Sequence, residues 1–67
     1  MIITVNSKPC NIKDNCYLTD VLDEIKLVNR VGIAIAVNNT VVPKTEWEKH
    51  IVNNKDNIVI INAIFGG

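Results

Sequence analysis

Residues 58–67 of this 67-residue chain read IVIINAIFGG. Their β-branched residues predict a strand over Ile58–Ile64. The run Ile58–Ile61 is apolar without alternation, which indicates a strand that is covered on both faces. We therefore expect the last strand to lie at the centre of a sheet, with Gly66 and Gly67 beyond it.

The first residues of the chain favour a hairpin. Ile2–Val5 is short, β-branched and predicted to be a strand. Residues 6–9 read NSKP, in which Asn and Ser bond their own backbone and Pro presets φ, so a turn is expected. The second strand of the hairpin is then predicted over Cys10–Lys13.

A helical pattern follows the hairpin. Its apolar residues recur at the spacing of one helix face and are Leu18, Val21, Leu22, Ile25 and Val28. Carboxylates stand early in this segment, where the positive end of the helix dipole favours them. Asn29 or Gly32 is expected to end the helix in the left-handed conformation.

The segment between this helix and the last strand contains two further strands. In Ile33–Val37 large residues alternate with Ala, which indicates a strand with one tightly packed face. The pair Asn38-Asn39 predicts a two-residue turn into a short strand, Thr40–Val42. Residues 43–49 (PKTEWEK) indicate one short helical turn, and residues 53–57 (NNKDN) indicate a turn.

This order of elements predicts the α+β fold class and, within it, the ubiquitin-like β-grasp. The β-grasp is a mixed five-stranded sheet with one main helix and, here, a short helical turn. The first and last strands are expected side by side and parallel, because they are the most continuously apolar. Residues 1–67 are expected to form a single β-grasp domain with a flexible C-terminal Gly-Gly tail.

The composition and length of the chain argue against several classes of function. The 7 basic residues balance the 7 acidic ones, and 48% of residues are hydrophobic, which argues against disorder and against a nucleic-acid partner. No run of about 18 apolar residues is present, so no membrane partner is expected. With two cysteines and no signal-peptide pattern, the expected location is cytoplasmic. A chain this short has little left to wall off a substrate pocket, so no catalytic residues of its own are expected.

The terminal glycines offer a chemical site instead. Residues without Cβ atoms can thread a narrow channel, so Gly66 and Gly67 are predicted to enter the active site of a partner. An unhindered α-carboxylate on Gly67 is then the reacting group. Ile64 and Phe65 follow the sheet toward this tail and are the candidate partner-binding residues.

Several motifs stand together in the second half of the chain: Ala36-Val37-Asn38, Val41-Val42-Pro43, Glu46-Trp47, His50-Ile51 and residues 58–67. With these motifs the chain resembles the ThiS family, the sulfur carrier proteins of thiamine biosynthesis. One departure is Lys55-Asp56, where the family often has Gly-Asp, so either Asn54 takes the left-handed position or the turn type differs. A second departure is Phe65, which is bulkier than the usual residue before the glycines.

The resemblance implies a reaction sequence performed by partners. A ThiF-like adenylyltransferase, using ATP and Mg²⁺, joins the Gly67 carboxylate to AMP. A cysteine desulfurase or other persulfide donor then supplies sulfur, which leaves a thiocarboxylate on Gly67 for a thiazole synthase. The carrier itself binds no cofactor and no metal. The alternatives are a molybdopterin synthase small subunit, whose family is longer and has prolines before its end, and a ubiquitin-like protein modifier.

Other polar residues are expected to be structural. Cys10, Cys16 and His50 lack zinc-ligand spacing, so we expect a core cysteine, a loop cysteine and an ordinary surface or packing histidine. Trp47 is expected to cover one edge of the core, since a small domain needs every large apolar residue. A solvated role is expected for Glu46, Glu48 and Asp56.

Overall fold

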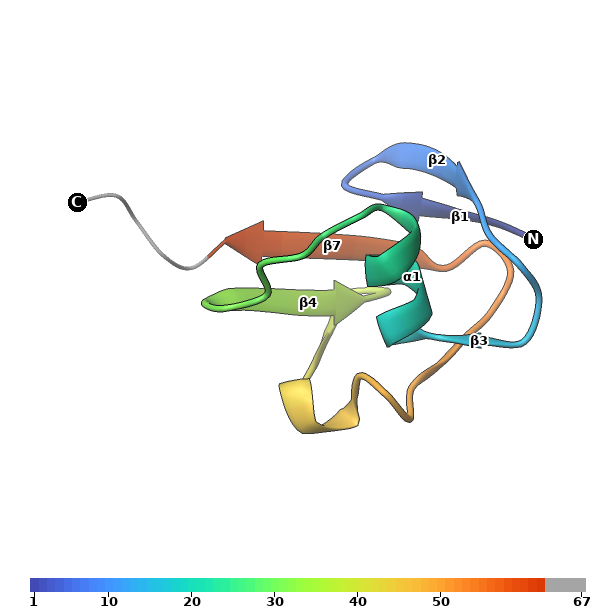
Figure 1. The fold of residues 1–67 in the computed structure, drawn as a ribbon. Helices are drawn as coiled ribbons and strands as arrows, with labels where there is room; N and C mark the ends of the chain where they lie inside the picture. The colour runs from blue at the N-terminus through green and yellow to red at the C-terminus, as the bar shows by residue number, and fades with distance from the viewer. Residues whose placement is uncertain (63–67) are drawn as a thin grey trace.

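The computed structural model describes residues 1–62, which form a five-stranded sheet with one α-helix against one face (Figure 1). The strand order is β2-β1-β7-β4-β5, with β1 and β7 parallel and the other neighbouring pairs antiparallel. This arrangement confirms the predicted mixed β-grasp sheet. Its strands are β1 (Ile2–Val5), β2 (Lys8–Asn11), β4 (Ile33–Val37), β5 (Thr40–Val42) and β7 (Asn57–Asn62).

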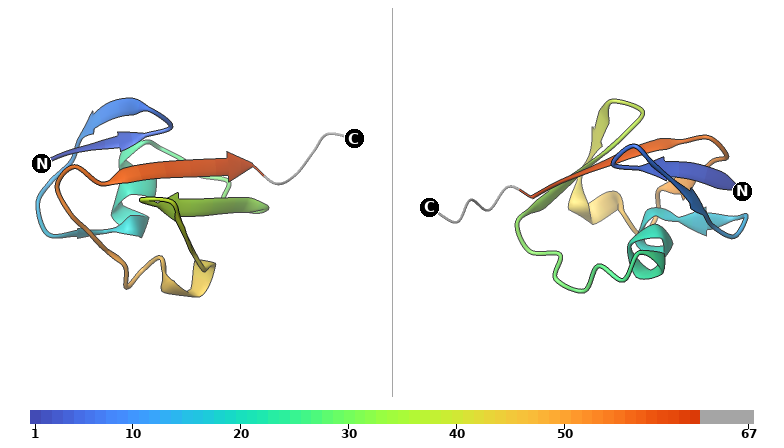
Figure 2. Two further views of the ribbon diagram at one scale, coloured as in Figure 1. Left: turned by 180° about the vertical axis from the view of Figure 1, so that it is seen from behind. Right: turned by 90° about the horizontal axis from the view of Figure 1, so that it is seen from above.

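The last strand, β7, is central in the sheet, as predicted, but it is not covered on both faces. Ile58 is fully buried, whereas Ile61 is 53% exposed. The helix packs under one face of the sheet, and the other face is open (Figure 2). The expectation of two covered faces was therefore wrong. The predicted strand residues Ala63 and Ile64 lie outside the described residues.

The helix, α1 (Leu18–Glu24), buries Leu18, Val21 and Leu22 in the core, as the periodicity predicts. Its first turn is closed by the carboxylate of Asp20, which accepts a hydrogen bond of 2.7 Å from the amide of Tyr17. An acidic residue at this position stabilises the free amide groups of a helix start.

The helix ends earlier than the periodicity predicts. The amide of Leu27 donates to the carbonyl of Leu22 (2.9 Å), and that of Lys26 donates to Asp23 (3.0 Å). With Lys26 at φ 60°, these two bonds form a Schellman motif, so Lys26 takes the left-handed position expected of Asn29 or Gly32. The side chain of Leu27 turns back to pack against the core, which ends the apolar stripe before Val28.

The N-terminal hairpin has a shorter turn than expected. Only Asn6 and Ser7 form it, with φ of 50° and 69°, so β2 begins at Lys8 instead of Cys10. Because β2 is an edge strand, Pro9 can stand inside it without breaking a ladder between two neighbours.

A second, two-stranded sheet was not predicted. It pairs β3 (Cys16–Tyr17) with β6 (Ile51–Val52), and strands of two residues are too short to show a period. Cys16 is buried in β3, whereas Cys10 is only half-buried beside the core. The predicted place of Cys10 in the second strand is therefore confirmed, whereas the loop position expected for Cys16 was wrong, because Cys16 is a core residue of β3.

The predicted helical turn is a short 3₁₀ helix, η1 (Lys44–Glu46). Trp47 follows it and is 3% exposed in the core, as expected, while Glu46 and Glu48 are exposed, as expected. Within residues 1–62, no helix is long and apolar enough to cross a lipid bilayer.

Candidate functional site

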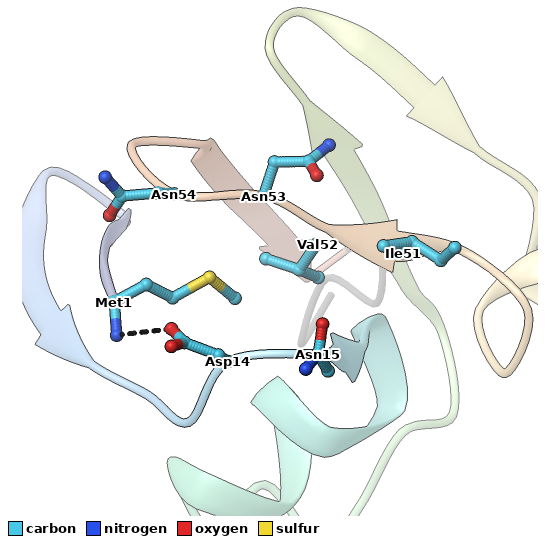
Figure 3. A pocket seen from close by; sticks show the side chains of 7 residues that line it. All are labelled: Met1, Asp14, Asn15, Ile51, Val52, Asn53 and Asn54. Atoms are coloured by element: carbon cyan, nitrogen blue, oxygen red, sulfur yellow. Dashed lines mark ion pairs between the residues drawn. The ribbon is translucent and has the colours of Figure 1, made fainter.

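A polar hollow of about 620 Å³ lies near the start of β1 (Figure 3). The acidic side chain in its wall, Asp14, is paired at 3.1 Å with the terminal ammonium of Met1. These two charged groups are engaged with each other, and the other side chains that line the hollow are amides or apolar, so it offers little for catalysis. Its walls are formed by Met1, Asp14, Asn15, Ile51, Val52, Asn53 and Asn54.

The residues weighed as a metal or nucleophile set do not form one in the part of the chain that the structure describes. No group of three or more His, Cys, Asp or Glu side chains there could hold a metal ion. Both cysteines are free thiols. Burial raises the pKa of the Cys16 thiol, and the nearby Asp20 carboxylate raises it further. Since the thiolate is the reactive form, Cys16 is a poor nucleophile.

We expect Cys10 and Cys16 to differ strongly in reactivity. After a brief exposure of the folded protein to iodoacetamide at pH 8, peptide mapping should find Cys10 labelled at least about tenfold faster than Cys16. The reason is that Cys16 is buried and its raised pKa leaves less thiolate, whereas Cys10 is partly exposed. Labelling in urea serves as the control and should bring the two rates together. Equal rates in the folded protein would contradict this placement of Cys16.

The predicted tail follows the carboxyl end of β7, so the position of that end in the fold decides where the tail begins. This end lies on the opposite side of the molecule from Met1 (Figures 1 and 2). There Asn62 pairs with Ile33 and Ile61 pairs with Ala34, at the start of β4. The predicted site residues Ile64, Phe65, Gly66 and Gly67 lie outside the described residues, so their roles stay predictions.

Two backbone amides of β7 donate hydrogen bonds to side chains in the hairpin turns on either side of it. Asn6, in the β1–β2 turn, accepts a hydrogen bond from the amide of Ile60 (2.8 Å). Asn38, in the β4–β5 turn, accepts one from the amide of Asn57 (2.9 Å). These bonds connect both hairpin turns to β7, so the strand has a defined position in the sheet.

Asp56 extends this network and is not solvated as expected. It is the buried charged residue among residues 1–62, and its carboxylate accepts hydrogen bonds from Asn38 Nδ2 (3.0 Å) and the amide of Asn53 (2.8 Å). A buried carboxylate is stable only with such donors. The neighbouring Lys55, at φ 72°, takes the left-handed position of the turn that was considered for Asn54. The sequence shows Asn38 and Asp56 only as turn residues, 18 positions apart.

The open face of the sheet is apolar beside the end of β7. Ala34 and Ala36 of β4 are half-buried, and Ala36 pairs with Val59 on one side and Val41 on the other. Val41 and Ile61 are exposed. The sequence signal for this face was the alternation of Ala with larger residues in β4, because alternate side chains of a strand lie on the same face of the sheet. Sequence reasoning did not identify Val41 or Ile61 as exposed.

Comparison of the sequence with models of known protein families shows that the model of the ThiS family matches residues 3–67. A protein of Escherichia coli (strain K12) named "Sulfur carrier protein ThiS" is 40% identical over 38 residues, a segment that spans 57% of this chain and 58% of that protein. The chain therefore aligns with little more than half of the length of this relative.

Two solved structures share the fold. The crystal structure of the thiamine biosynthesis protein (ThiS) from Geobacter metallireducens superposes with a TM-score of 0.86 at 22% identity and covers all of both chains. The solution structure of a thiamine biosynthesis protein from the same organism gives a TM-score of 0.76 at 23% identity, covering 100% of this chain and 88% of that one.

Proposed function

Because the chain belongs to the ThiS family, we propose that it is a sulfur carrier for thiamine biosynthesis whose Gly67 carboxylate bears the sulfur. The observation that carries this proposal is the central, side-chain-anchored strand β7, which leads five residues later to Gly67. The name of the Escherichia coli relative supports the same function.

The proposed chemistry begins with a carboxylate, which is a poor electrophile because its charge repels nucleophiles. An adenylating partner resembling ThiF joins the carboxylate to AMP from Mg²⁺-bound ATP, and pyrophosphate leaves. A persulfide, from a cysteine desulfurase or another donor, attacks the acyl carbon and displaces AMP. Cleavage of the S–S bond by a thiol then leaves a thiocarboxylate on Gly67, and a thiazole synthase takes the sulfur.

In this proposal the chain is a protein co-substrate and not an enzyme. Its contribution is the positioning of the reacting group, which is worth several orders of magnitude in effective concentration. The hydrogen bonds that the side chains of Asn6 and Asn38 accept from amides of β7 keep this strand in place while the partner acts on the tail. The cytoplasm is the proposed place of action, where Cys10 and Cys16 stay free thiols.

Intact-mass measurement tests the proposal. Protein purified from cells with an active thiamine pathway should contain a species about 16 Da heavier than the unmodified chain, from one carboxylate oxygen replaced by sulfur. Cells that lack the adenylating enzyme are the control and should yield the unmodified mass alone. A single unmodified mass from thiamine-starved wild-type cells would contradict the proposal. A ladder of conjugates to other proteins would favour a ubiquitin-like modifier instead.

A further inference from the structure

We propose that the α1–β4 loop, residues 26–32, is a docking element for the ATP-dependent adenylating enzyme that receives the tail, with Val28 and Val31 as its contacts. This inference rests on the proposed function. It assigns the partner a specific surface of the described fold, one that lies beside the point where β7 ends (Figure 1).

The reach of the tail limits where this partner can bind. Gly67 is the fifth residue after Asn62. Even when fully extended, five residues span at most about 17 Å. An active site that surrounds the Gly67 carboxylate must therefore approach the carboxyl end of β7 within that distance, and the protein around it must cover the neighbouring surface.

The α1–β4 loop is part of that neighbouring surface. It leads directly into Ile33, whose Cα pairs with that of Asn62. Val31 is thus two residues from the partner of the last described residue. Figure 2 shows from two further sides that this loop runs from the helix to the end of the molecule at which β7 finishes.

Two valines of this loop have no role in the core. Val28 is 90% exposed and Val31 is 66% exposed, whereas the preceding residue, Leu27, packs against the core. Exposed apolar side chains are common singly, but two of them in one short loop that leads to a functional end offer apolar area that a partner can desolvate.

An ion pair and two hydrogen bonds stabilise the loop in the conformation that exposes these valines. Arg30 forms an ion pair with Asp23 of α1, and its Nε donates to the carbonyl of Leu27 at 3.0 Å. The amide of Val31 donates to the side chain of Asn29 at 3.2 Å. An element that is ordered before binding loses less conformational entropy in the complex, so it suits docking.

Kinetics with Val28→Asp test the inference. The assay is carrier-dependent ATP–pyrophosphate exchange by the cognate adenylating enzyme, with the carrier varied. Placing a charge in a desolvated contact should raise the KM for the carrier about tenfold or more. The kcat at saturating carrier should stay within about twofold, because Gly67 itself is unchanged. Val28→Ser is the milder second variant and should raise KM in the same direction.

The matched control is Ile51→Asp. Ile51 is also apolar and 59% exposed, but it lies in β6, which pairs with β3 on the side of the molecule away from the end of β7 (Figure 1). The KM of the adenylating enzyme for the Ile51→Asp carrier should stay close to its KM for the wild-type carrier. Thermal unfolding of all variants checks that Val28→Asp, in a loop, leaves the fold intact.

The outcomes separate the inference from the proposed function. A wild-type KM in both folded Val28 variants would overturn the docking surface and leave the carrier function standing. An equal rise in KM for Ile51→Asp would also overturn it, because the effect would not be local. Absence of exchange with the wild-type chain would overturn the proposed function, and the docking surface with it.

Discussion

Deletion of Gly67 should abolish carrier-dependent pyrophosphate exchange by the adenylating enzyme. The shortened chain still ends in a carboxylate, on Gly66, but that group is set back by one residue, or about 3.5 Å of extended chain. Misplacement of a reacting atom by only 1 Å can cost about a hundredfold in rate. A shift of one residue should therefore reduce exchange below detection, measured as the return of labelled pyrophosphate into ATP.

The control for this deletion is its stability. Thermal unfolding followed by circular dichroism should give the same midpoint as the wild type, so that the loss is assigned to the tail and not to the sheet. Full exchange by the shortened chain would refute Gly67 as the reacting residue and, with it, the carrier hypothesis. Conjugation assays on the same variant distinguish a carrier from a modifier, because only a modifier forms adducts with lysines.

Replacement of Trp47 by Ala should destabilise the fold by about 3–5 kcal/mol, the usual range for a buried Trp or Phe. Trp47 is 3% exposed and lies in the core cluster with the buried residues of α1 and the sheet. At 0.05–0.15 kcal/mol per residue, a chain of 67 residues has a total stability of roughly 3–10 kcal/mol. The variant should therefore lose a large part of its stability, measured by urea unfolding with circular dichroism.

Trp47→Phe separates packing from hydrogen bonding. The indole Nε1 of Trp47 donates to the carbonyl of Val42 at 2.8 Å, which connects the segment after η1 to β5. Phe keeps most of the apolar volume but lacks this donor, so a smaller loss of about 1–2 kcal/mol is expected. A loss below about 1 kcal/mol for Trp47→Ala would contradict its place in the core.

Much of the fold could be predicted because its signals are local. β-Branched residues predict three of the strands, at Ile2–Val5, Ile33–Val37 and Ile58–Ile61. The pair Asn38-Asn39 predicts the turn between β4 and β5, and both residues there have positive φ (50° and 70°). These preferences arise from the steric limits of single residues and neighbours, so they can be read along the chain.

The errors arose where packing against the core, strand pairing or a side-chain hydrogen bond decided the structure against the local pattern. The helical spacing continues to Val28, but α1 stops at Glu24 because Leu27 turns back to the core and Lys26 takes the left-handed conformation. Cys16 was expected in a loop, yet it pairs with Val52 in a strand of two residues. Asp56 was expected in solvent, yet it bonds to Asn38 across 18 positions.

The candidate site divides in the same way. The proposed chemistry rests on the sequence by itself, because the Gly66-Gly67 pair and the motifs of the ThiS family can be identified along the chain. Only the tertiary structure decided which surface accompanies that tail. Pairing of Asn62 with Ile33 places the end of the loop that carries the exposed Val28 and Val31 beside the end of β7, although about 30 positions separate them in the chain. Strand pairing depends on long-range hydrogen bonds and a shared core, which no local pattern encodes.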